Sequence, residues 1–306
     1  MPTTSSDQSR TSGAAHVFDR ALLDRRRLRA LKNNDEGARY LLRAVASELA
    51  ERLSLVERRF AKAAEIGGHT GETAALIRNS GQTDELLRIE RDPALLSGWP
   101  NALVADDEFL PLEGDSLDLV VSPLALHFTN DTPGALIQIR RALKPDGLFL
   151  GATLGGETLG ELRASLLAAE TELTGGASPR VAPFIDVRDA GALLQRAGFA
   201  LPVADQDRLT VRYDSMFALM RDLRAIGSTN MLVERSRRPP SRALFLRAAA
   251  IYAERFSDRD GRVRATFDVV YLSGWKPHES QQKPLKPGSA KASLADALRD
   301  RSEDLG

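Results

Sequence analysis

The chain has 306 residues, of which 42% are hydrophobic and 27% are charged, a composition that is ordinary for a soluble globular protein with a substantial core. Lys plus Arg and Asp plus Glu both number 42, so no net charge favours nucleic acid or an anionic membrane as a partner. The absence of cysteine excludes disulfides, cysteine-ligated zinc, iron–sulfur clusters and a thiol nucleophile, and it fits a reducing compartment. No apolar run reaches the ~18–20 residues that a transmembrane helix needs.

The first 35 residues predict a flexible N-terminus that carries a short basic helix. Residues 1–13 are rich in Ser and Thr, which is typical of disordered segments. Residues 18–29 contain a run of arginines, as a transit peptide would, but such peptides are poor in acids and this stretch holds Asp19 and Asp24. We therefore expect a solvated helix that rests on the folded domain.

Beyond residue 36 the chain alternates between helical and strand patterns. Residues 36–56 repeat apolar side chains at helical spacing. Strands are then predicted at 60–66, 83–90, 102–106, 116–122 and 148–154, and helices at 72–78 and 131–143. Asp131 is the expected N-cap of the later helix, and residues 144–147, Lys-Pro-Asp-Gly, predict the turn that ends it. Strands and helices joined by short connections predict an α/β fold with a doubly wound, mostly parallel sheet.

The second half of the chain is richer in helical patterns. Helices are expected at 157–173, 186–197, 215–226 and 242–256, and strands at 209–213 and 263–275. These segments add extra helices after the fifth and sixth strands. We expect a single domain over residues 36–280, with a ligand-binding half at 36–155 and a substrate side at 156–280. Residues 281–306 are predicted to be a flexible tail, in which 293–298 could form one turn of helix.

The stretch 63–71 reads as the end of a buried strand, a glycine-rich turn and the start of a helix. Gly67 and Gly71 would let backbone N–H groups approach a ligand closely, because glycine lacks a Cβ and tolerates positive φ. The helix that follows directs the positive end of its dipole to the same point. Such a turn is also common in ordinary strand-to-helix connections, so a second signal is needed.

That second signal is Glu90, which ends the next predicted strand 19 positions after Gly71. This is the spacing of the carboxylate that binds ribose hydroxyls in nucleotide-binding βαβ units. Ligands bind doubly wound sheets at the carboxyl ends of the strands, which places the glycine turn, Glu90, Asp106 and residues 122–127 on one rim. The sequence therefore predicts a nucleotide-type cofactor site.

The arrangement of residues 36–155 resembles the class I S-adenosylmethionine-dependent methyltransferase fold. The resemblance implies S-adenosyl-L-methionine as cofactor, with its methionine part at the glycine turn, its ribose on Glu90 and its adenine amino group at Asp106 or Asp107. The residues assigned to the cofactor are Glu65, Gly67, Gly71, Glu90, Asp106, Asp107 and Ser122. The loop of that family usually has glycine where this chain has His69, whose ring either crowds the cofactor or lies outward.

Further segments resemble a narrower family, that of the mitochondrial complex I assembly factor that acts as an arginine hydroxylase, with its bacterial relatives. The segments are 105–111, 155–163, 175–179 and 274–281. The resemblance implies a protein substrate, the iron–sulfur subunit of complex I that carries the terminal cluster, modified on an arginine. It also implies action in the bacterial cytoplasm or on the matrix side of the mitochondrial inner membrane. Next in pattern are the malonyl carrier-protein O-methyltransferases of biotin synthesis.

The candidate catalytic residues are His127 and Glu157, which follow strand ends on the substrate side of the rim. Methyl transfer is an in-line displacement that depends mostly on positioning and needs no metal. His127 has apolar neighbours, which favour a core histidine, and Glu157 can equally be an acid stabilised by a helix dipole. As a carboxylate, Glu157 could hold a guanidinium bidentately. The four scattered histidines predict no metal site, so hydroxylation is implied by the resemblance alone.

Two classes of function remain open at this point. The first is an enzyme that modifies a protein or carrier-protein substrate with S-adenosylmethionine bound. The second is an assembly chaperone that keeps the fold for docking and has lost turnover, which His69 would permit. The sequence does not predict an oligomeric state.

Overall fold

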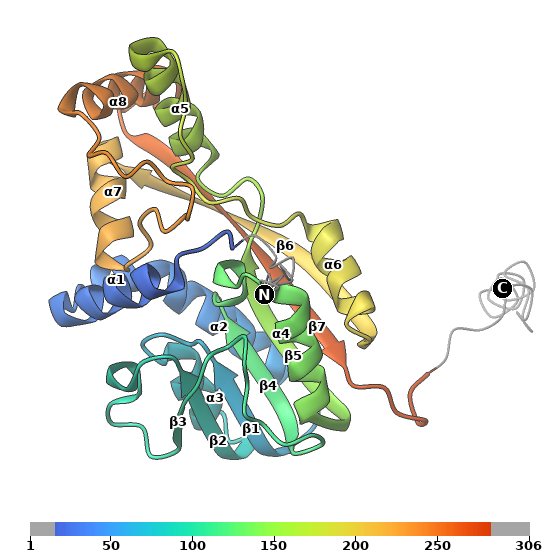
Figure 1. Cartoon of the computed structure of the whole chain (residues 1–306). Helices are drawn as coiled ribbons and strands as arrows, with labels where there is room; N and C mark the ends of the chain where they lie inside the picture. Colours follow the sequence, from blue (N-terminus) through green and yellow to red (C-terminus); the bar gives the residue numbers. More distant parts are fainter. Residues whose placement is uncertain (1–15, 283–306) are drawn as a thin grey trace, which may run out of the picture.

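The computed structural model describes residues 16–282, and a seven-stranded sheet lies at their centre (Figure 1). The strands are β1 (Phe60–Ile66), β2 (Thr83–Glu90), β3 (Ala102–Val104), β4 (Leu117–Pro123), β5 (Leu143–Leu154), β6 (Ala200–Tyr213) and β7 (Val263–Trp275). Their order in the sheet is β3-β2-β1-β4-β5-β7-β6. Strands β1 to β5 pair in parallel, and β7 is antiparallel to both of its neighbours. The predicted doubly wound, mostly parallel α/β sheet is confirmed.

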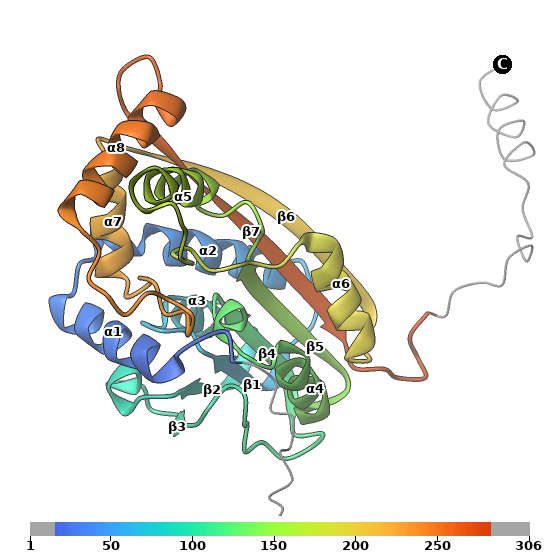
Figure 2. The same ribbon diagram turned by 45° about the horizontal axis from the view of Figure 1, so that its top comes forward.

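Helices cover both faces of this sheet (Figures 1 and 2). The helices are α1 (Arg20–Asn33), α2 (Tyr40–Ser54), α3 (Glu72–Asn79), α4 (Thr132–Ala142), α5 (Gly160–Thr174), α6 (Val187–Arg196), α7 (Met216–Ala225) and α8 (Arg242–Phe256). Short 3-10 turns are η1 (Gly37–Arg39), η2 (Pro93–Leu96) and η3 (Leu126–Phe128). No helix within residues 16–282 is both long and apolar enough to cross a membrane.

Two hydrophobic layers hold the helices to the sheet. On one face, α2, α3, α5, α7 and α8 share a core with β1, β4, β5 and β7, in which Leu49, Phe60 and Phe267 are almost fully buried. On the other face, α4 and α6 pack through Leu136 and Leu194. Each such side chain stabilises the fold by roughly 1.5–3 kcal/mol, so the sheet is a firm support for the loops at its edge.

Local signals placed most elements correctly. The strands at 60–66 and 83–90 have the predicted bounds, and Asp131 caps α4 by accepting a hydrogen bond from the Gly134 N–H at 2.9 Å. The extra helices follow β5 and β6, as predicted. The predicted helical turn at 293–298 and nearly all of the predicted tail lie outside the described residues.

Two strands are longer than predicted. Residues 144–147, predicted as a turn, belong to β5, because Leu143 already pairs with Leu117 and the register shifts before Leu148 pairs with Leu119. Asp146 takes up the irregularity with φ of 63°. Strand β6 begins at Ala200 rather than near 209, and its polar first half is stabilised by pairing along β7 instead of by burial.

Candidate functional site

The glycine turn after β1 depends on glycine for its own packing. Gly67 has φ of 70°, and a Cβ there would overlap the Cβ of Ala125. Gly71 has φ of 85°, and a Cβ there would lie 2.8 Å from the guanidinium carbon of Arg88. Both conformations are costly for a residue with a side chain. The turn therefore brings its backbone close to β4 on one side and to β2 on the other.

A buried ion pair between Glu65 and Arg88 holds this turn in place from inside the protein. Glu65 is fully buried, accepts the Ala74 N–H at 2.8 Å and pairs with the Arg88 Nε at 2.6 Å. Arg88, also buried, donates from Nη2 to the carbonyl of His69 at 3.0 Å and from Nη1 to that of Leu95 at 3.1 Å. The predicted cofactor residue Glu65 thus supports the turn from within the protein.

Glu90 and His69 meet where β2 ends. The Glu90 carboxylate is 2% exposed and accepts the backbone N–H of His69 through Oε1. Its Oε2 accepts no hydrogen bond from the residues that the structure describes, so this oxygen remains free for donors such as ribose hydroxyls. Burial raises the pKa of Glu90 to about 7, although Arg27 and Arg88 oppose this effect.

The ring of His69 lies in the site. His69 has φ of 54°, in the left-handed region that the family loop fills with glycine. It lines a cavity next to the glycine turn, and its buried Nε2 has no hydrogen-bond partner within residues 16–282. Burial lowers the pKa of His69 to about 3, so the imidazole is neutral at physiological pH. The structure therefore places the ring toward the ligand space and not outward.

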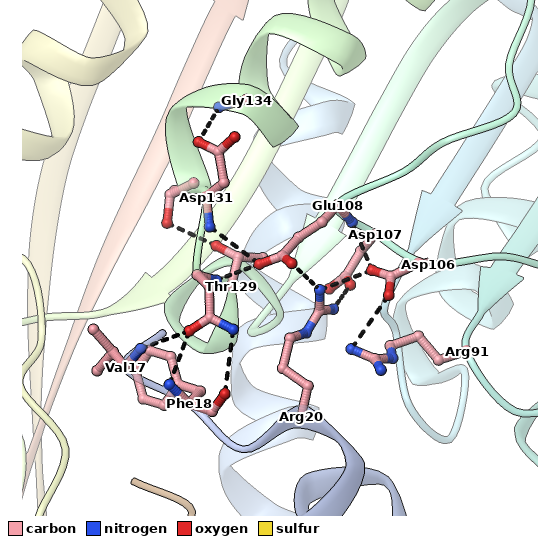
Figure 3. Close-up of polar contacts among 12 residues, drawn as sticks. Val17, Phe18, Arg20, Arg91, Asp106, Asp107, Glu108, Thr129, Asp131 and Gly134 are labelled. Carbon is pink, nitrogen blue, oxygen red and sulfur yellow. Dashed lines mark hydrogen bonds and ion pairs between the residues drawn. The ribbon is translucent and has the colours of Figure 1, made fainter. Parts of the chain in front are cut away.

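The acidic residues after β3 are held by a residue from the N-terminal helix (Figure 3). Arg20 of α1 places Nη1 2.7 Å from Asp106 and 2.6 Å from Glu108, and its Nη2 contacts Asp107. Arg91, which follows β2, approaches the other oxygen of Asp106 at 3.6 Å. One buried guanidinium therefore offsets the repulsion among three carboxylates, where the adenine of the cofactor is predicted to lie.

Helix α1 lies beside the loops at the carboxyl ends of β2, β3 and β4 (Figures 1 and 2). Just before it, the N–H groups of Val17 and Phe18 donate to the Asn130 side chain at 2.9 and 2.8 Å (Figure 3). Asp24 pairs with Arg91 at 3.0 Å. Instead of being mainly solvated, α1 ties these loops together and forms part of the site.

A cavity of about 530 Å³ opens next to the glycine turn. The turn contributes Gly67 and His69, the segment that follows β4 contributes Leu124 and His127, and α2, α5, α7 and β7 contribute mostly apolar side chains. His127 packs against Phe128, with ring centroids 4.0 Å apart. Its buried Nδ1 has no partner within the described residues, and burial lowers its pKa to about 3. His127 therefore faces the cavity as a neutral ring.

The other predicted residues lie around this cavity or away from it. At the carboxyl ends of the neighbouring strands, Arg27 of α1 lies near Glu90. Arg20 of α1 contacts Asp106 and Asp107. Ser122 is fully buried, and its Oγ donates to the Ile66 carbonyl at 3.2 Å, which joins β4 to β1. Glu157 is exposed and is not among the residues that line the cavity. The catalytic and cofactor assignments stay predictions, and the geometry favours His127 over Glu157.

Three arginines of the site were not predicted from the sequence: Arg20, Arg27 and Arg88. Arg88 could have been noticed, because it interrupts the apolar end of a strand that faces the core on both sides. The arginines of α1 carry no such signal, since a basic helical run usually lies in solvent. Within residues 16–282, no group of three or more His, Asp or Glu residues is arranged to hold a metal ion.

Comparisons with known proteins agree with this geometry. Residues 64–151 match the family model described as a methyltransferase domain. The chain is 42% identical to "Arginine-hydroxylase NDUFAF5, mitochondrial" of Danio rerio, over 92% of this chain and 89% of that protein. The human protein of the same name is 40% identical, over 92% of this chain and 83% of that protein.

A carrier-protein enzyme and a solved structure are also similar. The malonyl-[acyl-carrier protein] O-methyltransferase of Laribacter hongkongensis is 38% identical, over 85% of this chain and 90% of that protein. The crystal structure of the YcgJ protein of Bacillus subtilis covers 75% of this chain and 98% of its own, with a TM-score of 0.53 and 16% identity. At that identity the structural likeness shows the fold alone.

Proposed function

Because this chain belongs to the family of the arginine-hydroxylase NDUFAF5, within the class I S-adenosylmethionine-dependent methyltransferases, we propose that it modifies a protein with that cofactor bound at the glycine turn. The chain is an enzyme of the methyltransferase fold. The observation that carries the proposal is the extent of the identity. It runs over 92% of the chain, so it includes the substrate side as well as the cofactor half.

The residues present fit S-adenosylmethionine. In our proposal, Glu90 accepts the ribose hydroxyls through its free Oε2, and Asp106 or Asp107 contacts the adenine amino group. Gly67 brings the backbone to the methionine part, and the neutral rings of His69 and His127 line the space beyond it. The cofactor, when bound, supplies a sulfonium with an electrophilic methyl group. The residues of the chain orient it and exclude water from an apolar cavity.

The substrate we propose is an arginine of the iron–sulfur subunit of complex I, by analogy with the arginine-hydroxylase relatives. The site of action would then be the compartment where that subunit is assembled, the bacterial cytoplasm or the mitochondrial matrix. The relatives that support this reading are named as mitochondrial proteins.

A second candidate, methylation of a malonyl carrier protein, has one observation in its favour. Every ionised side chain that the described residues contribute to the cavity lining is an arginine. A malonyl carboxylate could pair with such a side chain, whereas a guanidinium would find no carboxylate there. The similarity to the Laribacter hongkongensis enzyme gives this candidate further support.

Intact-mass analysis of both substrates would decide between these candidates. The chain would be co-expressed with the iron–sulfur subunit. In a separate experiment, the purified chain would be incubated with malonyl carrier protein and S-adenosylmethionine. We expect the iron–sulfur subunit to gain one oxygen atom, with dioxygen as the oxidant and a two-electron reductant supplied by the cell, because a sulfonium methyl donor cannot insert oxygen. A gain of one methylene by the carrier protein alone would support the second candidate. Unmodified substrates, together with impaired complex I assembly when the chain is absent, would support a chaperone that has lost turnover.

A further inference from the structure

The cavity carries positive charge that no negative charge on its walls balances. Among residues 16–282, no aspartate or glutamate lines it. The lining arginines are Arg26, Arg27, Arg39, Arg180, Arg224, Arg235, Arg237 and Arg238. The whole chain has equal numbers of basic and acidic residues, so this excess is a local feature of the fold and not a result of composition.

Some of these arginines already have carboxylate partners behind the wall. The pairs are Arg39–Glu72 at 3.7 Å, Arg180–Glu170 at 2.6 Å and Arg235–Asp19 at 2.9 Å. The others make no ion pair with any residue that the structure describes: Arg26, Arg27, Arg224, Arg237 and Arg238. We call these five residues the arginine rim.

The rim is formed by α1, α7 and the loop between α7 and α8. Burial lowers the pKa of Arg26, and the neighbouring Arg235 and Arg29 lower it further. The guanidinium of Arg27 lies over the Phe128 ring, 5.3 Å from its centroid, and burial lowers its pKa, although Glu90 and Asp24 oppose this effect. A cation that is buried beside other cations is destabilised, and a bound anion would relieve this cost.

The first part of the loop between α7 and α8 is held next to α1 through residues 230–232, and Arg237 and Arg238 follow as exposed residues of the same loop. The Asp19 N–H donates to the Met231 carbonyl at 2.8 Å, and Arg26 donates to the Asn230 carbonyl. Phe18 and Leu232 form an antiparallel bridge. This anchoring reduces the entropy that the first part of the loop would lose when a partner binds.

The kind of anion follows from the shape of the site and the spread of its charges. The rim charges come from three separate segments around the cavity, which suits an extended ligand that carries several acids better than one small anion. Arginine forks match carboxylates bidentately, and several carboxylates in one segment would meet several forks. The aromatic rings of Phe128 and Phe184 in the lining pack against the His127 ring, with centroids 4.0 and 5.9 Å away, instead of standing apart as platforms on which bases could stack.

We propose that the arginine rim binds an acidic segment of the protein that carries the substrate, and so positions the modified group over the cavity. The inference rests on the proposed function only in that the substrate is carried by a protein. It holds for an iron–sulfur subunit and for a carrier protein alike. The segment would use Asp or Glu side chains near the modified group, and the apolar cavity would receive that group.

Binding of labelled peptides tests this proposal directly. Fluorescence anisotropy would compare a short glutamate-rich peptide with a lysine-rich peptide of equal length. We expect the full chain to bind only the acidic peptide, with an affinity that falls as salt rises. In the double variant Arg237→Glu/Arg238→Glu, we expect the affinity to fall at least about tenfold. Arg224→Gln, which removes one charge at the cavity wall, should weaken binding severalfold.

The matched control is the double variant Arg188→Glu/Arg259→Glu, which changes net charge equally at exposed positions that do not line the cavity. We expect it to keep the affinity for the acidic peptide within about twofold. Equal losses in both double variants, equal binding of both peptides, or no binding of the acidic peptide would overturn the proposal. Titration with S-adenosylhomocysteine separates this result from the cofactor assignment, because the rim variants should retain that affinity.

Discussion

Replacing Glu90 with glutamine should strengthen the fold and weaken the cofactor site. The carboxyl is 2% exposed, and its pKa is raised to about 7 from an unfolded value of 4.5. Below pH 4.5 it is protonated in both states, and between pH 4.5 and 7 the folded state keeps a proton that the unfolded state has lost. Stability therefore falls as pH rises through this window, by roughly 3 kcal/mol.

The Glu90→Gln variant cannot ionise, and its carbonyl oxygen can still accept the His69 N–H. At pH 8 we expect its free energy of unfolding to exceed that of the wild type by roughly 1–3 kcal/mol. The gain is nearer the lower value if the new side-chain NH2 group finds no acceptor in the folded state. In a domain of this size the melting temperature would rise by roughly 2–8 °C. Thermal and urea unfolding at pH 5 and pH 8 would measure the difference, which should shrink at the lower pH.

The same variant should bind the cofactor less tightly. Losing a charged acceptor for ribose hydroxyls costs about 1.5–3 kcal/mol, or roughly 10- to 150-fold in affinity for S-adenosylhomocysteine. In the wild type, affinity should improve as pH rises through 7, because only the carboxylate accepts both hydroxyls. The affinity of Glu90→Gln should not vary with pH. Isothermal titration at pH 6 and pH 8 would check both statements.

Glu85→Gln is the control, since Glu85 is an exposed residue of the same strand and makes no ion pair within the described residues. We expect it to match the wild type in stability and in affinity. If Glu90→Gln bound S-adenosylhomocysteine as tightly as the wild type, Glu90 would not be the ribose ligand. If it were less stable than the wild type at pH 8, the reasoning from burial would be refuted.

Three further predictions concern the turn, the N-terminal helix and the cavity. Gly67→Ala should lower the free energy of unfolding by about 1–3 kcal/mol more than Gly81→Ala, since both have positive φ but only the first meets another side chain; equal losses in urea unfolding would contradict this. Arg20→Gln should destabilise by about 2–4 kcal/mol, because it leaves Asp107 and Glu108 without an ion pair and Asp106 with only the Arg91 contact at 3.6 Å. Arg25 is exposed, so Arg25→Gln should change stability by less than about 0.5 kcal/mol. Similar shifts in melting temperature for Arg20→Gln and Arg25→Gln would contradict the stabilising role of Arg20. The His127 ring, whose pKa is about 3, should show no NMR titration between pH 5 and 8, and a midpoint in that range would mean that the ring is hydrated.

Much of the fold could be predicted from local pattern. The apolar strands at 60–66 and 83–90, the glycine turn between them and the acid at position 90 are each specified within a few residues, and the structure has them at those bounds. Strand β6 could not be predicted in full, because its residues 200–208 are polar and gain their stability from pairing with β7. The early start of β5 could not be predicted either, because Lys-Pro-Asp-Gly is a typical turn sequence and only the pairing with β4 places it in a strand.

Residues at the carboxyl ends of the strands could be assigned to one edge from the sequence pattern, because parallel strands end at the same edge of a sheet. Only the tertiary structure decided which of them face a ligand. It buried Glu65 and Ser122 as supports, turned His69 into the cavity, left Glu157 outside it and brought the α1 arginines over the acids. The physical reason is that charge partners such as Arg20 and Asp106 are 86 residues apart, so no local pattern can reveal that each compensates the other.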